Sequence, residues 1–554
     1  MNLKSKNLYT VAFLVGLVSL AVYLRALSCD FINFDDPTYV IENTGIRSMG
    51  KDFWYWAFCT IPLNYWTPLL WISFAIDYRF WGLDPFGYHL TNILMHALNA
   101  ALFVIFADKV YTQSCNIVKN GHSRYLYPGM LLAAGLLFAV HPARVESVVW
   151  VTERKDVLNG VFTLGFLIFY LRYLQKKNDP VQEHGMGREY ILSLLLFTLS
   201  MLIKPSSFLL PLALLLMDWY PLRRFNREKL SSLFLEKMPF MICGALIVSI
   251  SIVFRMKQGG FNSLSDFPLA VRTVAAGNSL VEYFMLMLFP VNILPYSILP
   301  RAVPILYIYK AVAAAIVLCG TIFFGKRFPA FTASVLFFVV TILPSLHFIT
   351  DGYQTVLSPR YTYLPSILAC ILAAPALVSA CQKIAVSAGR YGVYIVAGVL
   401  SALFIFYVGT TVTLIGDWKN SGVFWTKVID RQPFDKAYYF RGLYFAERGE
   451  YRAAVKDYTT CIGLATQRTL PDIHNVYASR ADALLKAGYY SDALDDFTTA
   501  ITLYPHPLYY YHRGVVLKIL GRLNEADADF ARAGNAAGEL IWFEGPLANN
   551  WLLN

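Results

Sequence analysis

The chain has 554 residues, of which 57% are hydrophobic, 16% aromatic and only 15% charged. This composition excludes an ordinary soluble multidomain protein and predicts that most of the chain lies in a lipid bilayer. The net charge of +11 does not indicate nucleic-acid binding, because the basic residues cluster in short loops between apolar runs, as the positive-inside rule expects.

The first apolar run, Leu8 to Leu27, follows Lys4 and Lys6 and has roughly the 20 residues that cross hydrocarbon. No small-x-small cleavage site closes it, so we expect a retained membrane anchor and not a signal peptide. Further apolar runs of spanning character follow, and two of them are short. They are 88–106, 127–140, 157–174, 190–203, 208–219, 238–254, 305–324, 328–347, 361–380 and 391–415.

Lysine and arginine indicate the orientation of these spans. With the amino end in the cytoplasm, the basic loops at 109–124, 176–177 and 223–229 all fall on the cytoplasmic side. Val271 to Pro290 is apolar enough to cross, but a crossing there would put two basic pairs outside, so we expect a re-entrant or interfacial helix. The prediction is an all-α polytopic membrane bundle at 1–415 with roughly eleven spans, and everything after Ile415 outside the cytoplasm.

The first external loop, 28–88, contains the acid pair Asp35-Asp36 and then a Trp-rich tract typical of the headgroup zone. Cys29 and Cys59 fall in this loop, and their pairing is left open. The eight cysteines have no C-x-x-C spacing, which argues against structural zinc. In the next span, His89, Asn92, His96 and Asn99 follow one helix face, a pattern that helix–helix hydrogen bonds also explain.

The chain changes character after Gly416, where charge rises and long apolar runs stop. Gly449, Gly488 and Gly521 recur with similar surroundings at steps of 39 and 33 residues, close to the roughly 34-residue tetratricopeptide period. We therefore expect a linker at 416–435 and a short solenoid of about three repeats at 436–554. Such a solenoid usually binds a peptide or protein.

Charged residues gather in the predicted outer loops, where the positive-inside rule disfavours lysine and arginine. Arginine and lysine there would hold a phosphate, and a carboxylate would take a proton from an attacking hydroxyl. The candidates for catalysis are Asp35 and Asp36, those for phosphate binding are Arg154, Lys155, Lys204 and Arg360, and the supporting residues are His89, His141, Glu146, Glu153, Asp156, Tyr361 and Tyr363.

Each of these candidates also has a structural explanation. Asp35-Asp36-Pro37 suits a turn or helix cap, the run from Glu153 to Asp156 suits a solvated surface, and a single cation suits a headgroup contact. His141 suits a structural hydrogen bond. A divalent metal on the acid pair has no further nearby ligands to support it.

Several motifs, in this order, resemble the transmembrane-and-tetratricopeptide O-mannosyltransferase family and its bacterial relatives. The resemblance covers nearly the whole chain. The motifs are Asn33–Pro37, Tyr65–Leu69, Gly87–Asn92, His141-Pro142 with Val145–Ser147, Trp150–Asp156, Lys204-Pro205 and Arg360–Pro365.

The resemblance implies a GT-C glycosyltransferase that uses a polyprenyl-phosphate sugar, with its site in the first external loop and its repeats presenting a protein acceptor. Asp35 and Asp36 match the acidic pair of the family, and the expected localisation is a bacterial inner membrane with the repeats extracytoplasmic. The chain departs from the family at Arg144, where relatives often have histidine, and in having only about three repeats. The sugar and the acceptor therefore stay open.

The expected function is inverting transfer of one sugar to a protein hydroxyl. Two other classes of function compete with it. A membrane scaffold would need the repeats but not the loop acids and cations, and a transporter of lipid-linked sugars would place ionisable residues near the bilayer midplane.

Overall fold

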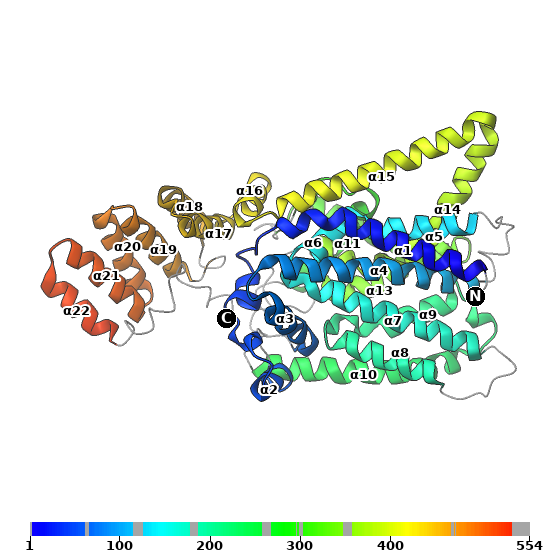
Figure 1. Cartoon of the computed structure of the whole chain (residues 1–554), viewed down its shortest axis with the longest axis horizontal. Coiled ribbons are helices and arrows are strands. Elements are labelled where there is room, and N and C mark those ends of the chain that lie inside the picture. The colour runs from blue at the N-terminus through cyan, green and yellow to red at the C-terminus, as the bar shows by residue number, and fades with distance from the viewer. Residues whose placement is uncertain are drawn as a thin grey trace. The chain divides into compact units, whose positions relative to one another are not determined.

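The computed structural model describes residues 3–60, 66–114, 126–177, 187–257, 268–294, 296–297, 303–346, 357–466, 470 and 472–534. All regular elements in these ranges are helices (Figure 1), so the all-α prediction is confirmed. The chain forms two compact units. The first comprises Met1–Cys29 and Asn43–Gly416, and the second comprises Asp30–Glu42 and Asp417–Asn554.

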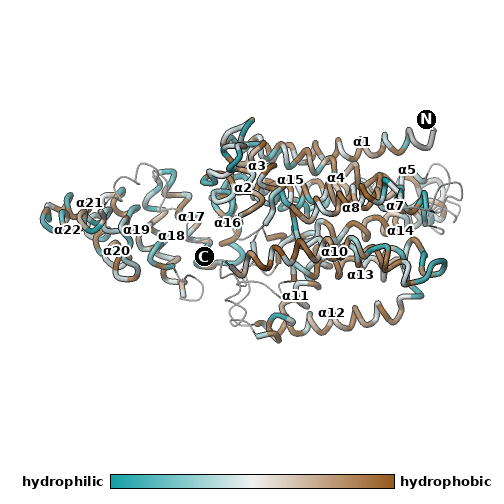
Figure 2. Tube along the Cα trace, turned by 90° about the horizontal axis from the view of Figure 1, so that it is seen from below, coloured by the Kyte–Doolittle hydropathy of each residue, from teal (hydrophilic) through white to brown (hydrophobic). Residues whose placement is uncertain are grey.

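The first unit is a helical bundle whose apolar sequence explains its packing. Helix α4 lies against α1, α5 and α7, and α7 continues the layer to α8 (Figure 1). Hydrophobic residues run along these helices (Figure 2). The bounds are α1 Leu3–Tyr23, α2 Lys51–Cys59, α3 Pro68–Trp81, α4 Pro85–Gln113, α5 Leu126–Ala139, α6 Val145–Val149, α7 Arg154–Lys177, α8 Arg188–Met201, α9 Leu210–Trp219, α10 Leu230–Lys257, α11 Leu269–Leu288, α12 Ile305–Phe323, α13 Pro329–Ile342, α14 Ser366–Ser387 and α15 Gly392–Asp417.

The described residues contain fewer long apolar helices than the roughly eleven spans predicted. Among the described residues, seven helices are long and apolar enough to cross a membrane, or eight if the bent pair of α5 with the segment Pro142–Val149 is one span. Helices α8, α9 and α13 are apolar but have only 14, 10 and 14 residues, and a helix of 14 residues is only about 21 Å long. Helix α11 is not among the spanning helices, and its interfacial placement stays a prediction.

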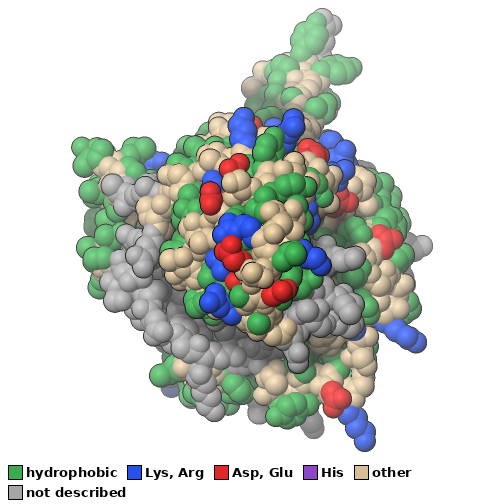
Figure 3. Space-filling view, turned by 90° about the vertical axis from the view of Figure 1, so that its left-hand side faces the viewer, with side chains coloured by type: hydrophobic (Ala, Val, Ile, Leu, Met, Phe, Trp, Pro, Cys, Tyr) green, Lys and Arg blue, Asp and Glu red, His purple; other side chains and the backbone are tan. Residues whose placement is uncertain are grey.

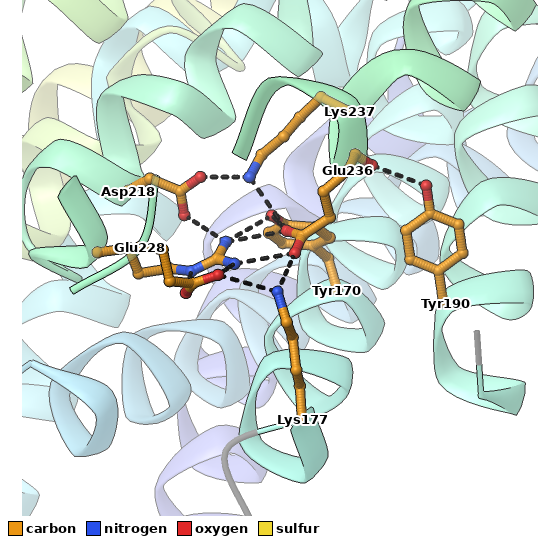
Figure 4. A network of polar contacts seen from close by, with 8 residues as sticks. Tyr170, Lys177, Tyr190, Asp218, Glu228, Glu236 and Lys237 are labelled. Carbon is orange, nitrogen blue, oxygen red and sulfur yellow. Dashed lines mark hydrogen bonds and ion pairs between the residues drawn. The ribbon is translucent and has the colours of Figure 1, made fainter. Parts of the chain in front are cut away.

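Buried ions join the ends of α7, α9 and α10 (Figure 4). Arg224 contacts Asp218 at 2.9 Å and Glu236 at 2.9 Å, and it contacts Glu228 at 2.7 Å. Lys237, which is fully buried, is also paired with Asp218. Lys177 contributes a third cation, at 2.8 Å from Glu236. Three cations thus face three carboxylates, so buried charge is compensated within the bundle.

The second unit is a stack of helical hairpins. Its helices are α16 Ser421–Arg431, α17 Asp435–Glu447, α18 Tyr451–Leu464, α19 Ile473–Lys486, α20 Tyr490–Leu503, α21 Pro507–Ile519 and α22 Leu523–Ala533. The hairpins are α17 with α18, α19 with α20 and α21 with α22. The segment 416–435, which the sequence predicts as a linker, contains α16, which packs against α17.

The three glycines that recur along the repeat region occupy equivalent turns between paired helices. Gly449, Gly488 and Gly521 have φ of 76°, 86° and 76°, in the left-handed region that only glycine adopts without strain. The same left-handed turn therefore recurs once in each repeat, which explains the glycine spacing that predicted the solenoid.

The face of α21 and α22 shown in Figure 3 carries acidic and basic side chains among hydrophobic ones.

Candidate functional site in the first unit

An open cavity of about 420 Å³, its mouth included, lies in the first unit. Several of the sequence-predicted site residues line it, together with serines that the sequence did not single out. The lining residues are Asp156, Lys204, Ser206, Ser207, Leu209, Leu210, Thr341, Ser345, Arg360, Tyr361, Tyr363, Leu364 and Pro365. Polar and cationic groups thus converge on one small open space.

Lys204 and Asp156 form an ion pair at this cavity. Lys204 immediately precedes the 3-10 turn Pro205–Leu209, and its side chain is 19% exposed. Asp156 is in the first turn of α7, and its other oxygen accepts a hydrogen bond from Ser147 at 3.0 Å. The lysine ammonium lies 5.7 Å from the centre of the Tyr361 ring. Lys204 is therefore a fixed positive charge with part of its surface still open.

Arg360 is the second cation of the cavity and is held by two buried carboxylates. It is paired with Glu146, and its Nε lies 3.3 Å from Glu153. Its guanidinium also lies over the Trp150 ring, at 5.0 Å from the ring centre, and over the Tyr361 ring, at 4.9 Å. Burial lowers the pKa of Arg360, but the two carboxylates outweigh burial and leave that pKa above its ordinary value. Arg360 is therefore charged at any working pH.

Glu146 organises the 3-10 turn that carries Arg360. It accepts hydrogen bonds from the Ser358 hydroxyl at 2.5 Å and from the Arg360 backbone N–H at 3.1 Å. Its neighbour Glu153 lies 3.0 Å from the Lys155 ammonium, which is the third cation of the cluster. The predicted Glu146, Glu153, Lys155, Asp156, Lys204 and Arg360 thus form one connected cluster.

Arg154 faces away from this cluster. Its guanidinium is fully buried, pairs with Asp77 at 2.5 Å and donates to Asn92 at 2.8 Å. It also donates to the backbone oxygens of Ser73 and Tyr88. These contacts tie the start of α7 to α3 and α4, and Arg154 is not among the residues that line the cavity.

The predicted supporting residues divide into two groups. Tyr361 and Tyr363 line the cavity, and the Tyr363 hydroxyl also bonds His96 at 2.8 Å and Asn99 at 3.0 Å. His89 is buried on α4 outside the lining. His141 accepts from the Ala143 N–H at 3.2 Å and donates to the Met287 oxygen at 3.2 Å, so both of its ring nitrogens serve the backbone.

The acid pair belongs to the second unit, in the segment Asp30–Glu42. Asp36 is 1% exposed, and its Oδ2 accepts a hydrogen bond from the Ile32 N–H at 2.9 Å. Asp35 is only half-buried, and its backbone oxygen accepts from the Tyr39 N–H at 3.0 Å. The two neighbouring acids therefore differ, since one is enclosed within its own loop and the other is partly open.

The side-chain arrangement of the described residues bears on metal binding and on cysteine pairing. No group of three or more histidine, cysteine, aspartate or glutamate side chains there is arranged to hold a metal ion. Cys29 and Cys59 are both free thiols, and Cys29 contacts the Ile415 backbone oxygen at 3.9 Å. The pairing that the sequence left open is thus not present. Tyr65, the first residue of one quoted motif, lies outside the described residues.

The sequence reasoning missed several partners of the predicted residues. Ser358 and Ser147 hold Glu146 and Asp156, and Asp77 holds Arg154. Ser147 and Asp156 are only nine residues apart, so their spacing could have suggested a contact between α6 and the first turn of α7. Asp77 and Ser358 are distant from their partners in sequence and carry no such signal.

Comparison with known proteins finds similarity to proteins named as protein O-mannosyl-transferases. The tetratricopeptide repeat profile matches residues 435–468. Protein O-mannosyl-transferase TMTC4 of Mus musculus is 33% identical over 208 residues, which cover 34% of this chain and 27% of that protein. Protein O-mannosyl-transferase F38B6.6 of Caenorhabditis elegans is 24% identical over 487 residues, which cover 83% of this chain and 63% of that protein.

The same name recurs in other animals. Protein O-mannosyl-transferase tmtc2 of Xenopus laevis is 30% identical over 164 residues, 28% of this chain and 18% of that protein. The chain spans less than two thirds of the length of these curated relatives. No solved structure is significantly similar to it. These relationships confirm the family resemblance that the motifs indicate.

Proposed function

From the similarity of this chain to named protein O-mannosyl-transferases, we propose that it transfers one sugar from a polyprenyl phosphate to a protein hydroxyl. The observation that carries the proposal is the cavity at which Lys204 and Arg360 both present partly exposed cationic side chains. A phosphate ester is the ligand that such a pair suits, because lysine supplies a point charge and arginine a planar fork.

The donor phosphate is assigned to Lys204 and Arg360, with Lys155 as a third cation of the cluster. Arg154, which the sequence also suggested for phosphate, is assigned a positioning role, because Asp77 and Asn92 occupy its guanidinium. It fixes the first turn of α7, from which Asp156 reaches the cavity. Lys204 is thus held by Asp156 of α7. Lys155 and Arg360 are held by Glu153 and Glu146, which lie in the short helical segments just before α7.

The general base is assigned to Asp35. Asp36 is enclosed and uses one carboxylate oxygen to hold the Ile32 N–H, so it serves to shape the loop. Asp35 is the more exposed of the two, as a group that must reach a substrate hydroxyl requires.

The proposed reaction is a single inverting displacement. The acceptor hydroxyl oxygen attacks the anomeric carbon and forms the new glycosidic bond, while the bond between that carbon and the phosphate oxygen breaks. The hydroxyl proton passes to the Asp35 carboxylate, and the polyprenyl phosphate leaves with the bonding electrons. Lys204 and Arg360 stabilise the negative charge that grows on the departing phosphate.

The repeats are proposed to engage the acceptor protein on the same side of the membrane as the acid loop, outside the cytoplasm of a bacterium. The names of the relatives make a mannosyl donor the first one to test.

The test is transfer by the full chain in proteoliposomes, with radiolabelled polyprenyl-phosphate sugars and extracted envelope protein as acceptor. Asp35→Asn should lower the rate by roughly 100-fold or more, while the protein keeps its melting temperature. Asp52→Asn is the matched control, because Asp52 is an exposed acid of the same predicted loop. Transfer that Asp35→Asn leaves unchanged would contradict the assignment, and a wild-type protein inactive with every donor would favour a scaffold.

A further inference from the structure

The loop that carries the acid pair is built into the repeat unit. Residues Asp30–Glu42 group with Asp417–Asn554, although almost 400 residues separate the two segments. The contact begins at the start of the loop, where the Asp30 backbone N–H donates to the Lys419 backbone oxygen at 2.9 Å. The conformation of the acid loop therefore depends on the first helices of the second unit.

Asn33 makes three hydrogen bonds to the first helices of the second unit. Its side-chain oxygen accepts a hydrogen bond from the Trp425 indole N–H at 2.8 Å, and its side-chain nitrogen donates to the Phe440 backbone oxygen at 2.8 Å. Its backbone N–H donates to the Ser421 hydroxyl at 2.9 Å. One residue thus links the loop to α16, which carries Ser421 and Trp425, and to α17, which carries Phe440.

Phe34 completes the attachment with apolar contacts. Its ring meets Trp425 and Phe440 edge-on, with centroid distances of 5.8 and 5.6 Å. Trp425 and Phe440 in turn stack at 4.9 Å with an interplanar angle of 12°. Trp425 is fully buried and Phe440 is 1% exposed. Two consecutive residues before Asp35 are therefore fixed by the repeat unit.

We infer that Asn33 is a positioning residue, through which α16 and α17 hold Asp35 where the acceptor hydroxyl must be deprotonated. This inference rests on the proposed function. A displacement of about 1 Å in a reacting group can lower a rate by roughly 100-fold, and Asn33 is two residues from Asp35. The repeat unit then has a second task besides acceptor binding, because it sets the geometry of the base.

Acceptor capture by the repeats and positioning of the base by Asn33 have different kinetic consequences. If the repeats only captured a long acceptor, a fault at Asn33 would leave transfer to a short serine peptide unaffected. If Asn33 positions the base, kcat falls even with a peptide too short to occupy the repeats, while KM for the lipid donor is unchanged.

The experiment measures kcat and both KM values for the full chain in proteoliposomes, with a short serine peptide as acceptor. Asn33→Ala should lower kcat roughly 10-fold or more, with KM for the donor unchanged. Trp425→Phe removes the indole N–H and part of the stacked ring system but leaves the other hydrogen bonds of Asn33 in place, so it should lower kcat by less. Trp418→Phe makes the same change in a tryptophan that packs against Phe424 and should match the wild type.

The possible results separate a failure of the Asn33 inference from a failure of the proposed function. An active wild type with an Asn33→Ala variant of normal kcat overturns the inference and leaves the proposed function standing. An inactive wild type defeats the proposed function itself. If Asn33→Ala fails to fold, as judged by its melting temperature, the milder Trp425→Phe decides, and normal kcat in that variant overturns the inference. A loss confined to KM for a long acceptor also overturns it.

Discussion

Arg441 and Asp457 are joined by two parallel hydrogen bonds of 2.7 and 2.8 Å, which run between the two helices of one hairpin. The remaining arm of Arg441 donates to Thr426 of the preceding helix, α16, at 3.2 Å. The arrangement recurs in the next two hairpins, with Arg480, Asp496 and Thr459 and with Arg513, Asp529 and Thr498. One arginine per repeat thus ties together the two helices of its own hairpin and also the helix that precedes the hairpin.

These arginines are expected to stabilise the solenoid. Arg480→Ala should lower the free energy of unfolding of the repeat unit by about 2–3 kcal/mol, because it removes charge-assisted hydrogen bonds and leaves the buried Asp496 without its guanidinium partner. Arg480→Lys should recover only part, since lysine has no planar fork. Resistance of the repeats to proteolysis in urea measures the change. Arg452→Ala, at an exposed arginine of α18, should stay within about 0.5 kcal/mol of the wild type.

The hairpin turns should require glycine for conformational reasons alone. Gly488 has φ of +86°, and a Cβ there would meet no atom within 4 Å. Gly488→Ala should therefore cost about 1–2 kcal/mol through backbone strain and without a clash. Gly463 in α18 is equally uncrowded but has an ordinary φ, so Gly463→Ala should be neutral or stabilising by about 0.5 kcal/mol. The same urea assay compares the two, and equal losses would refute the conformational explanation.

The two cavity cations should affect the donor and not the acceptor. Lys204→Ala and Arg360→Ala should each raise KM for the polyprenyl-phosphate sugar roughly 10-fold or more, because each removes a charged contact to phosphate. KM for the protein acceptor should not change. Lys176→Ala serves as control, since Lys176 is half-exposed and pairs with Glu189 on α8. An increase of the same size in that control would show a general charge effect.

The ion network of Figure 4 should be a major source of stability for the bundle. Asp218→Asn removes the carboxylate that pairs with the fully buried Lys237 and with Arg224. Breaking such a buried pair costs about 3–5 kcal/mol, so the melting temperature in detergent should fall clearly. Glu189→Gln at the more exposed pair with Lys176 should change stability by less than about 1 kcal/mol. A silent Asp218→Asn would mean that water or neighbouring groups solvate Lys237.

The sequence predicted the features that repeat or that concern neighbouring residues. Apolar runs predicted helices, and glycines recurring at steps near 34 residues predicted the solenoid, because each repeat uses the same left-handed turn. The motifs also contained most residues of the cavity cluster. The number of spans was less well predicted, because composition alone does not show that α8 and α9 end after 14 and 10 residues.

Only the tertiary structure decided what each charged side chain does. Arg154 and Lys155 are adjacent in sequence, yet Asp77 holds the first inside the bundle and Glu153 holds the second beside the cavity. Asp35 and Asp36 differ in burial. Their loop is attached to α16 through the hydrogen bond from Trp425 to Asn33, two residues that lie 392 positions apart in the sequence. Such contacts depend on how distant segments pack and leave no periodic trace along the chain, so composition and spacing cannot reveal them.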